Sequence, residues 1–446
     1  MQRPLSPRGA RPHIIFIVAD DLGFADLGCY GGRDADFGAV SPVLDALAAS
    51  GMRFTQGYSN SPVCSPTRFA LMTARYQYRL RGAAEEPISI RTRASATLGL
   101  PPEVPTVPSL LKAAGYRTAL IGKWHLGYPP HFGPLKSGYE EFFGPMSGGV
   151  DYFTHCATNG EHDLYLGEEH RNEEGYLTDL ISRSSADYID RMAKQDAPFF
   201  LSVHYTAPHW PWETRDDAGV AAEVKDNLFH LHGGNIHTYR RMIHHMDEGI
   251  GWIMDALRRN GIERDTLVVF TSDNGGERFS DNWPLVGGKM DLTEGGIRVP
   301  WIAHWPALIP AGTTSDQLCM TMDWSATVLD AAGVAAHPAY PLDGVSLLPV
   351  LRDPAKHFAR PLYWRMKHRG QRAYREGAWK YLRVDGHDYL FNLPADERER
   401  ANQAGREPQR LAAMRDAWEE WNNSMPPIPE DATVSLGYGA RDMPQR

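Results

Sequence analysis

The sequence lacks any hydrophobic run long enough to cross a bilayer. The longest apolar stretch near the start, residues 14–19, has six residues, whereas a membrane-spanning helix needs roughly 20. The first twelve residues hold three arginines and three prolines, but not the apolar core that a secretory signal peptide carries. We therefore expect no membrane partner and a cytoplasmic location.

Cysteine is scarce, and positive charge is not in excess. Four cysteines in 446 residues, with no CxxC pair, exclude a disulfide-stapled domain and a zinc ribbon. Lys and Arg total 46 against 55 for Asp and Glu, so the net charge is −9, with both signs interspersed. A nucleic-acid surface needs a basic stripe. We therefore expect no nucleic-acid partner and a small-molecule ligand.

Runs typical of buried strands alternate with helical segments over most of the chain. Four β-branched and aromatic runs have the pattern of strands buried on both faces of a parallel sheet: residues 13–19, 118–121, 199–203 and 267–270. Segments of helical periodicity separate them: residues 41–50, 107–114, 176–192 and 238–259. This alternation predicts an α/β fold, a doubly wound and mostly parallel sheet flanked by helices.

The pattern changes after about residue 355. Short alternating pieces follow at residues 361–364, 378–382 and 389–392, and a charged helical stretch covers residues 409–421. These predict a small C-terminal antiparallel sheet with a closing helix. We therefore divide the chain into a catalytic domain (11–355), a sheet-and-helix subdomain (356–426) and a C-terminal tail (427–446).

Polar side chains follow three of the predicted strands, at the edge where open parallel sheets bind ligands. Asp20 and Asp21 follow the first strand, residues 123–125 follow the second, and Asp273 with Asn274 follows the last. Clustered carboxylates repel one another and, beside an amide oxygen, suit a hard cation such as Ca²⁺ or Mg²⁺. The alternative is that the two motifs only form turns.

Residues 64–68, Cys-Ser-Pro-Thr-Arg, form the most specific motif of the sequence. With Leu71, Thr73 and Arg75 behind it, the segment resembles the signature of the formylglycine-dependent sulfatases, which oxidise the motif's cysteine to an aldehyde. Ala74 departs from the family, which usually has glycine there. The resemblance implies that Cys64 becomes formylglycine through a formylglycine-generating machinery acting on the nascent chain. The alternative is that Cys64 is a small buried hydrophobic residue.

Further segments resemble landmarks of the same family, in the family's order. Residues 122–127 are similar to its second signature, residues 273–276 to its metal-binding turn, and residues 287–300 to its leaving-group loop. Residues 343–347 and 389–393 are similar to its late landmarks. The chain is therefore identified as an arylsulfatase-like member of the alkaline phosphatase superfamily.

The family's roles, placed on the matching positions, imply a complete site. One divalent ion, Ca²⁺ or else Mg²⁺, is implied to bind Asp20, Asp21, Asp273, Asn274 and an oxygen of the modified Cys64. A hydrated aldehyde has two hydroxyls, one to attack sulfur and one to expel sulfate afterwards; Asp273 could accept the first proton and His125 the second. Contacts with the sulfuryl and leaving-group oxygens are implied for Arg68, Lys123, His209 and Lys289.

These motifs predict hydrolysis of sulfate monoesters, with an aryl or sugar leaving group. Ser147 and Trp210 are further candidates for substrate binding, Trp210 together with Trp212 as a wall, although both tryptophans could instead pack in the core. A phosphonate monoester or phosphodiester hydrolase with the same site remains open, as does a catalytically silent anion-binding protein. A two-zinc phosphatase would want more histidines beside the carboxylates, and His244 and His245 have no spacing that supplies them.

Overall fold

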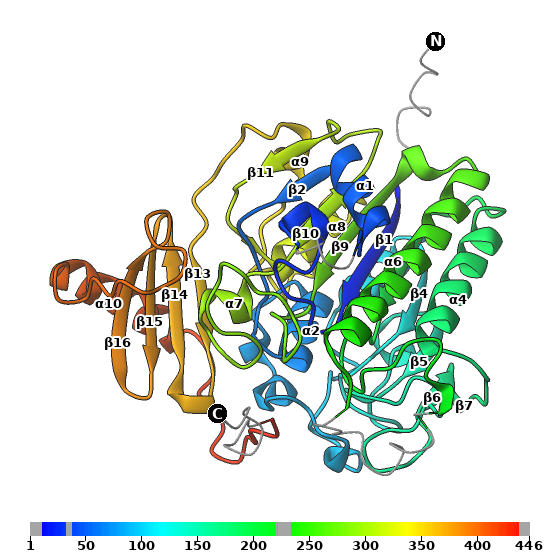
Figure 1. The fold of residues 1–446 in the computed structure, drawn as a ribbon, viewed down its shortest axis with the longest axis horizontal. Helices are drawn as coiled ribbons and strands as arrows, with labels where there is room; N and C mark the ends of the chain where they lie inside the picture. The colour runs from blue at the N-terminus through cyan, green and yellow to red at the C-terminus, as the bar shows by residue number, and fades with distance from the viewer. Residues whose placement is uncertain (1–10, 33–37, 220, 222–232, 437–446) are drawn as a thin grey trace.

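The computed structural model describes residues 11–32, 38–219, 221 and 233–436. A ten-stranded sheet with the strand order β11-β2-β10-β9-β1-β8-β4-β5-β6-β7 forms its centre (Figure 1). The strands are β1 (His13–Ala19), β2 (Met52–Phe54), β4 (Arg117–Gly122), β5 (Glu141–Pro145), β6 (Leu164–Leu166), β7 (Glu169–His170), β8 (Phe199–His204), β9 (Thr266–Ser272), β10 (Trp301–His304) and β11 (Thr313–Ser315). The five strands β9-β1-β8-β4-β5 run parallel, which confirms the mostly parallel sheet.

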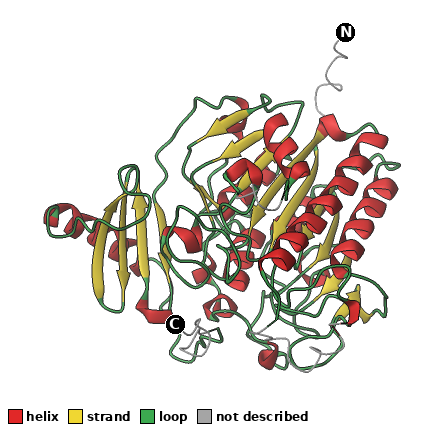
Figure 2. Cartoon of the chain, viewed as in Figure 1, coloured by secondary structure: helices red, strands yellow, loops and turns green. Residues whose placement is uncertain are grey.

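Helices cover both faces of this sheet (Figure 2). They are α1 (Pro42–Ser50), α2 (Cys64–Thr73), α3 (Val107–Ala113), α4 (Leu177–Met192), α6 (Ile236–Arg259), α7 (Glu294–Ile297), α8 (Thr321–Ala331) and α9 (Leu348–Arg352). Strand β1 shows why the layers form, because its side chains alternate between two apolar cores. Ile15 and Ile17 pack with α1, α4 and α6, and Ile14 and Phe16 pack with α2, α3 and α8. The sheet is therefore doubly wound, as predicted.

The C-terminal part is a four-stranded antiparallel sheet with one helix packed on it (Figure 1). Its elements are β13 (Leu362–Arg365), β14 (Arg372–Glu376), β15 (Trp379–Val384), β16 (His387–Asn392) and α10 (Pro408–Asn423). Trp364 and Phe391 of this sheet share an apolar cluster with Cys64 and Ala70 of α2. The predicted sheet and helix are confirmed, and the boundary at residue 355 stays a prediction.

Two shorter features complete the fold. Strands β3 (Gly57–Tyr58) and β12 (Cys319–Met320) pair in parallel beside the start of α2. The last ten residues of the predicted tail lie outside the described residues, but Val434 forms an isolated parallel bridge with Glu86. Among the described helices, none combines the length and the apolar character needed to cross a membrane.

Candidate active site

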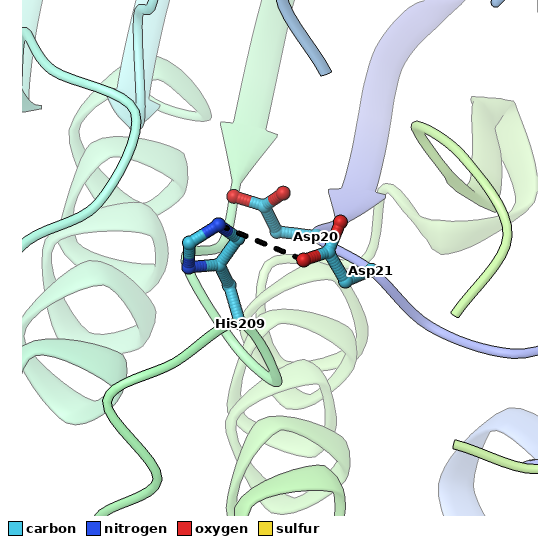
Figure 3. Close-up of side chains that lie close together, drawn as sticks. All are labelled: Asp20, Asp21 and His209. Atoms are coloured by element: carbon cyan, nitrogen blue, oxygen red, sulfur yellow. Dashed lines mark ion pairs between the residues drawn. The ribbon is translucent and has the colours of Figure 1, made fainter. Parts of the chain in front are cut away.

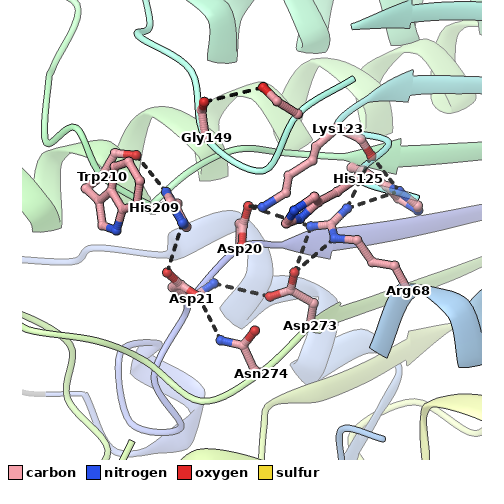
Figure 4. Close-up of polar contacts among 12 residues, drawn as sticks. Asp20, Asp21, Arg68, Lys123, His125, Gly149, His209, Trp210, Asp273 and Asn274 are labelled. Carbon is pink, nitrogen blue, oxygen red and sulfur yellow. Dashed lines mark hydrogen bonds and ion pairs between the residues drawn. The ribbon is translucent and has the colours of Figure 1, made fainter. Parts of the chain in front are cut away.

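The predicted site residues meet at the carboxyl ends of the central strands. Asp20 and Asp21 follow β1, Lys123 and His125 follow β4, His209 lies beyond β8, and Asp273 and Asn274 follow β9. Cys64 and Arg68 come from the first turns of α2, and Lys289 comes from the loop before α7. All of these side chains are buried, and Figure 4 shows how they lie, apart from Cys64 and Lys289. Segments far apart in sequence therefore build one enclosed polar cluster.

The backbone bends sharply where two of these side chains enter the cluster. Asp21 and His125 have φ values of 63° and 58°, in the left-handed region that non-glycine residues seldom adopt and that occurs often at functional sites. Gly122 ends β4 with φ 114°, and a Cβ atom there would lie 1.9 Å from the His204 carbonyl oxygen. Only glycine permits this close approach, which leads directly into Lys123.

Cys64 is the first residue of α2, where the helix dipole favours negative charge. The next turn is fixed by side-chain hydrogen bonds, because Ser65 Oγ accepts from Ile88 N at 2.8 Å and Thr67 Oγ1 accepts from Ser61 N at 3.0 Å. Burial raises the pKa of the Cys64 thiol to about 11. The unmodified side chain is therefore a protonated thiol, which is a poor nucleophile.

The end of α2 explains the family's preference for glycine at position 74. Ala74 caps the helix with φ 54° and ψ 27°, a conformation that costs an L-residue roughly 1–2 kcal/mol. Its carbonyl accepts hydrogen bonds from the backbone N–H groups of Asp343 and Gly344, and the Asp343 carboxylate binds Arg79 at 2.7 Å. The landmark at residues 343–347 thus anchors the end of the helix that carries Cys64.

Three of the buried groups can hold a metal ion. One ligand atom from each of Asp20, Asp21 and His209 lies within 4.8 Å of the others (Figure 3). Asp20 Oδ1 and Asn274 Oδ1 are also buried and have no hydrogen-bond partner among the described residues. An unsatisfied buried acceptor costs roughly 1–3 kcal/mol, which a hard cation would offset. The carboxylate and amide oxygens of Asp20, Asp21 and Asn274 therefore fit a divalent ion with oxygen ligands.

Each carboxylate of the cluster faces a buried cation, and Figure 4 shows two of these pairs, Lys123 with Asp20 and Arg68 with Asp273. Lys123 contacts Asp20, Lys289 Nζ lies 2.6 Å from Asp21 Oδ2, and Arg68 donates from Nε and Nη2 to Asp273 Oδ2 at 3.0 and 2.8 Å. Three carboxylates are thus balanced by three cations. A divalent ion would make this cluster positive, which suits an anionic ester.

Burial and these contacts shift the carboxylate pKa values in opposite directions. Burial alone would raise the pKa of Asp21, but Lys289 and His209 outweigh it and lower that pKa to about 2. Burial and the charge of Asp20 raise the pKa of Asp273 to about 6. The two carboxyl groups, which lie on neighbouring strands, therefore differ strongly in how readily each takes a proton.

The two predicted histidines are oriented by backbone carbonyls. His125 Nε2 lies 2.8 Å from the Ile88 carbonyl oxygen; since a carbonyl only accepts, Nε2 carries the proton and Nδ1 presents a lone pair. His209 Nδ1 lies 2.6 Å from the Trp210 carbonyl oxygen, and its Nε2 lies 3.6 Å from Asp21 Oδ2. Burial lowers the pKa of His125 well below its usual range, and burial with Lys289 lowers that of His209 to about 3.

A pocket opens from the cluster to the outside. Its volume is about 500 Å³ when the solvent-filled space at its open mouth is included. Its lining includes the predicted residues Cys64, His125, Ser147, His209 and Trp210. The Ser147 hydroxyl donates to the Asp163 carboxylate, so it is already oriented. The two tryptophans differ in position. Trp210 lines the pocket, whereas Trp212 packs in the core against Phe279. The structure keeps His244 and His245 out of this pocket's lining.

Sequence reasoning missed three contributors to the site. His204 lies beneath it, with Nδ1 3.1 Å from the Lys123 carbonyl oxygen and 3.4 Å from Arg68 Nη1. Ile88 acts through its backbone alone, and so gives no chemical signal in the sequence. Gln371 holds the loop after Lys289. Its place in the sequence, just before β14, does not by itself indicate this contact.

Gln371 comes from the C-terminal subdomain and is buried. Its Nε2 donates to the Met290 carbonyl oxygen at 2.8 Å, and its Oε1 accepts from Leu292 N at 2.9 Å. These two bonds clamp the backbone directly after Lys289. The subdomain thus contributes to the geometry of the site, although it supplies none of the predicted site side chains.

Comparisons with known proteins identify the family of this chain. The family model described as Sulfatase matches residues 12–334, and the model described as N-sulphoglucosamine sulphohydrolase, C-terminal, matches residues 288–402. The chain is 34% identical over 360 residues to N-acetylgalactosamine-6-sulfatase of Canis lupus familiaris, covering 76% of this chain and 66% of the relative. It is 32% identical over 401 residues to arylsulfatase A of Homo sapiens, covering 83% and 74%.

A solved structure extends the likeness to nearly the whole chain. The crystal structure of Ps i-CgsB in complex with k-i-k-neocarrahexaose superposes with a TM-score of 0.81 at 32% identity, covering 92% of this chain and 93% of that one. By contrast, the chain spans about two thirds of the length of the N-acetylgalactosamine-6-sulfatases, 66% in the dog protein and 68% in the mouse protein. The chain belongs to the sulfatase family of the alkaline phosphatase superfamily, a family of sulfuric ester hydrolases.

Proposed function

We propose that this protein hydrolyses sulfate monoesters of sugars, with a nucleophile formed from Cys64. One observation carries the proposal: Cys64 begins a helix at a buried cluster of three carboxylates and three cations, and it also lines the pocket that opens from this cluster. With a divalent ion bound, this enclosed cluster would be positively charged, which is the arrangement that stabilises charge developing on an anionic ester.

Conversion of Cys64 to formylglycine is the first part of the proposal. The protonated thiol, with its pKa raised to about 11 by burial, is unsuited to the attack, whereas a hydrated formylglycine supplies a hydroxyl nucleophile. The conversion requires the cell's formylglycine-generating machinery as a partner. Asp273, whose pKa lies near 6, is the base that takes the proton of the attacking group.

The second part is one Ca²⁺ or Mg²⁺ ion. Asp20, Asp21, Asp273 and Asn274 would hold it, because these side chains bring hard oxygen donors together and two of the oxygens lack a hydrogen-bond partner among the described residues. Such an ion supplies positive charge that lowers the cost of forming an alkoxide.

The cations and histidines divide the remaining work. Arg68 and Lys123, on the Asp20 and Asp273 side, hold the sulfuryl oxygens. Lys289 and His209 both flank Asp21 Oδ2, at 2.6 and 3.6 Å, and serve the leaving oxygen. His125 presents an Nδ1 lone pair toward which the second hydroxyl can release its proton. His125 acts in the protonation state that its hydrogen bond to the Ile88 carbonyl defines. His209, whose Nδ1 proton faces the Trp210 carbonyl and whose pKa is lowered to about 3, must first gain a proton at Nε2 before it can donate one to the leaving oxygen.

A sugar is the leaving group that the pocket and the relatives favour. Ser89, Ser147, Thr158 and Ser435 bring hydroxyl groups to the lining, and Trp210 adds an aromatic ring on which a sugar can stack. Of the three proteins named above, one is an N-acetylgalactosamine-6-sulfatase and one was solved in complex with k-i-k-neocarrahexaose, while the third is an arylsulfatase. We propose this substrate class for the present chain on that support.

A substrate panel tests the proposal. Purified protein from a host with the modifying machinery should release sulfate from 4-nitrophenyl sulfate and from galactosamine and galactose sulfates. The Cys64→Ala variant, with the same fold by circular dichroism, should release none. Turnover of a phenyl phosphonate without turnover of any sulfate would replace the proposal with phosphonate hydrolysis. Equal turnover by Cys64→Ala would overturn the proposed nucleophile.

A further inference from the structure

The chain returns to the substrate pocket after it has completed the C-terminal subdomain. Ser435 and Leu436 lie beyond α10, yet they line the same pocket as Cys64 and His125. Leu436 is partly buried and packs against the apolar cluster that contains Cys64. In Figure 1 the red C-terminal segment accordingly lies below the body of the molecule, beside the light-blue chain that follows α2.

Backbone and side-chain hydrogen bonds hold this segment in place. Glu86 N donates to the Thr433 carbonyl at 2.9 Å, and Ser435 N and Leu436 N donate to the Glu86 carbonyl at 3.0 and 3.3 Å. Fully buried Glu85 accepts from Thr433 N at 3.1 Å, and Ser435 Oγ donates to the Pro87 carbonyl at 2.6 Å. The segment is therefore fixed on residues 85–87 by an isolated parallel bridge and by side-chain hydrogen bonds.

Residues 85–87, which hold this C-terminal segment, lead directly into residues that contact the proposed reacting groups. Two residues after Glu86, Ile88 N donates to Ser65 Oγ at 2.8 Å, and the Ile88 carbonyl accepts from His125 Nε2 at 2.8 Å. Ser65 follows Cys64 directly. The position of Leu436 relative to the nucleophile is thus set through a short, hydrogen-bonded path.

We infer that Ser435 and Leu436 are specificity-determining residues that contact the leaving alcohol of the ester. Neither belongs to the cluster at the reacting sulfur, so each acts on the part of the substrate that departs. Apart from the two histidines, the described side chains of the lining carry no charge. The segment therefore favours an uncharged ring, with Leu436 as one apolar wall. The identity of the ester in this inference rests on the proposed function, whereas the contact with the pocket's ligand does not depend on it.

Variants of one residue test the contact, with a neighbour as the control. Leu436→Trp narrows the pocket and Leu436→Ala widens it, whereas Val434 is 37% exposed and outside the lining, so Val434→Trp changes the same segment without entering the pocket. The kcat/KM values for one-ring 4-nitrophenyl sulfate and two-ring 4-methylumbelliferyl sulfate give a size-preference ratio. Leu436→Trp should lower the two-ring to one-ring ratio roughly tenfold, the scale of a methylene-sized misfit in a pocket. Leu436→Ala should shift the ratio the other way, and Val434→Trp should leave it unchanged.

Equilibrium binding separates this inference from the proposed function. In the Cys64→Ala background, calorimetric Kd values for the same two esters report contact without turnover. If the wild type cleaves neither these two esters nor the galactosamine and galactose sulfates, the proposed function fails, and a Kd ratio that follows Leu436 still supports the contact. The inference would be overturned if Leu436→Trp, Val434→Trp and the parent all gave the same size-preference ratio and the same Kd ratio.

Discussion

Replacing Lys289 by alanine separates assistance to the leaving group from binding of sulfate. Lys289 Nζ is buried 2.6 Å from Asp21 Oδ2, on the same oxygen that His209 approaches. Lys123 provides a matched control, because it is also a buried lysine but contacts the neighbouring carboxylate of Asp20. Both lysine-to-alanine variants remove one buried ammonium from the cluster and take one cationic partner from one carboxylate.

The expected effect depends on the leaving group. One general-acid contact contributes roughly 10²–10⁴-fold, which corresponds to roughly 3–5 kcal/mol of barrier at 1.36 kcal/mol per decade. Lys289→Ala should lose this full factor on phenyl sulfates with poor leaving groups. It should lose far less on 4-nitrophenyl sulfate, because a nitrophenolate needs little protonation. Lys123→Ala should instead slow all the esters alike, because the sulfuryl oxygens are common to them.

The assay is the slope of log kcat/KM against leaving-group pKa over a series of phenyl sulfates. The slope should steepen in Lys289→Ala and His209→Ala, and it should match wild type in Lys123→Ala. Circular dichroism and thermal unfolding show whether each variant is folded. A slope unchanged in both Lys289→Ala and His209→Ala would refute the division of roles and assign both residues to binding of the sulfate group.

Three further predictions concern the metal ion, the C-terminal clamp and a buried acid. Asp21→Ala should lose one equivalent of bound Ca²⁺ or Mg²⁺ together with turnover, whereas stoichiometric zinc, or metal-free active protein, in elemental analysis of the wild type would contradict the site. Gln371→Leu removes both hydrogen bonds to the loop after Lys289 and should slow poor leaving groups roughly tenfold; equal slowing of every ester would mean that Gln371 does not position Lys289. Burial and Asp151 raise the pKa of Glu213 from 4.5 to about 9, so the stability that its protonated form contributes is full below pH 4.5 and is lost as the pH rises towards 9. Glu213→Gln should therefore reduce the pH dependence of the unfolding free energy between pH 5 and 8, at most about 1.4 kcal/mol per unit, and identical profiles for the two proteins would count against it.

The central sheet could be predicted because its strands are buried on both faces. An uninterrupted apolar run such as β1 has no other stable place in a folded chain. The strands that sequence reasoning missed are short or charged. β2 has three residues, and β14 reads Arg-Ala-Tyr-Arg-Glu. Arg375 of β14 is buried, with its guanidinium 3.5 Å from the Glu294 carboxylate. A local sequence pattern cannot predict an ion pair with a residue so distant in the sequence.

The site residues also differ in how far the sequence could predict them. Cys64 and Asp273, which we propose as the nucleophile and its base, stand in motifs whose residue types indicate such chemistry. Ile88 orients His125 through a carbonyl group that every residue has, and Gln371 holds the loop of Lys289 from another subdomain. Such contacts depend on tertiary folding alone. The cytoplasmic location predicted from the sequence stays a prediction.

Peptide mass spectrometry of Cys64 tests the central claim most directly. Protein made in a host with the modifying machinery is denatured, treated with iodoacetamide and digested, and the peptide of Cys319, another buried cysteine, serves as the alkylation control. Replacement of CH₂SH by CHO makes the Cys64 peptide about 18 Da lighter than the thiol form. We expect that lighter, unalkylated peptide while the Cys319 peptide alkylates fully. An active preparation in which the Cys64 peptide also alkylates fully would contradict the proposed nucleophile.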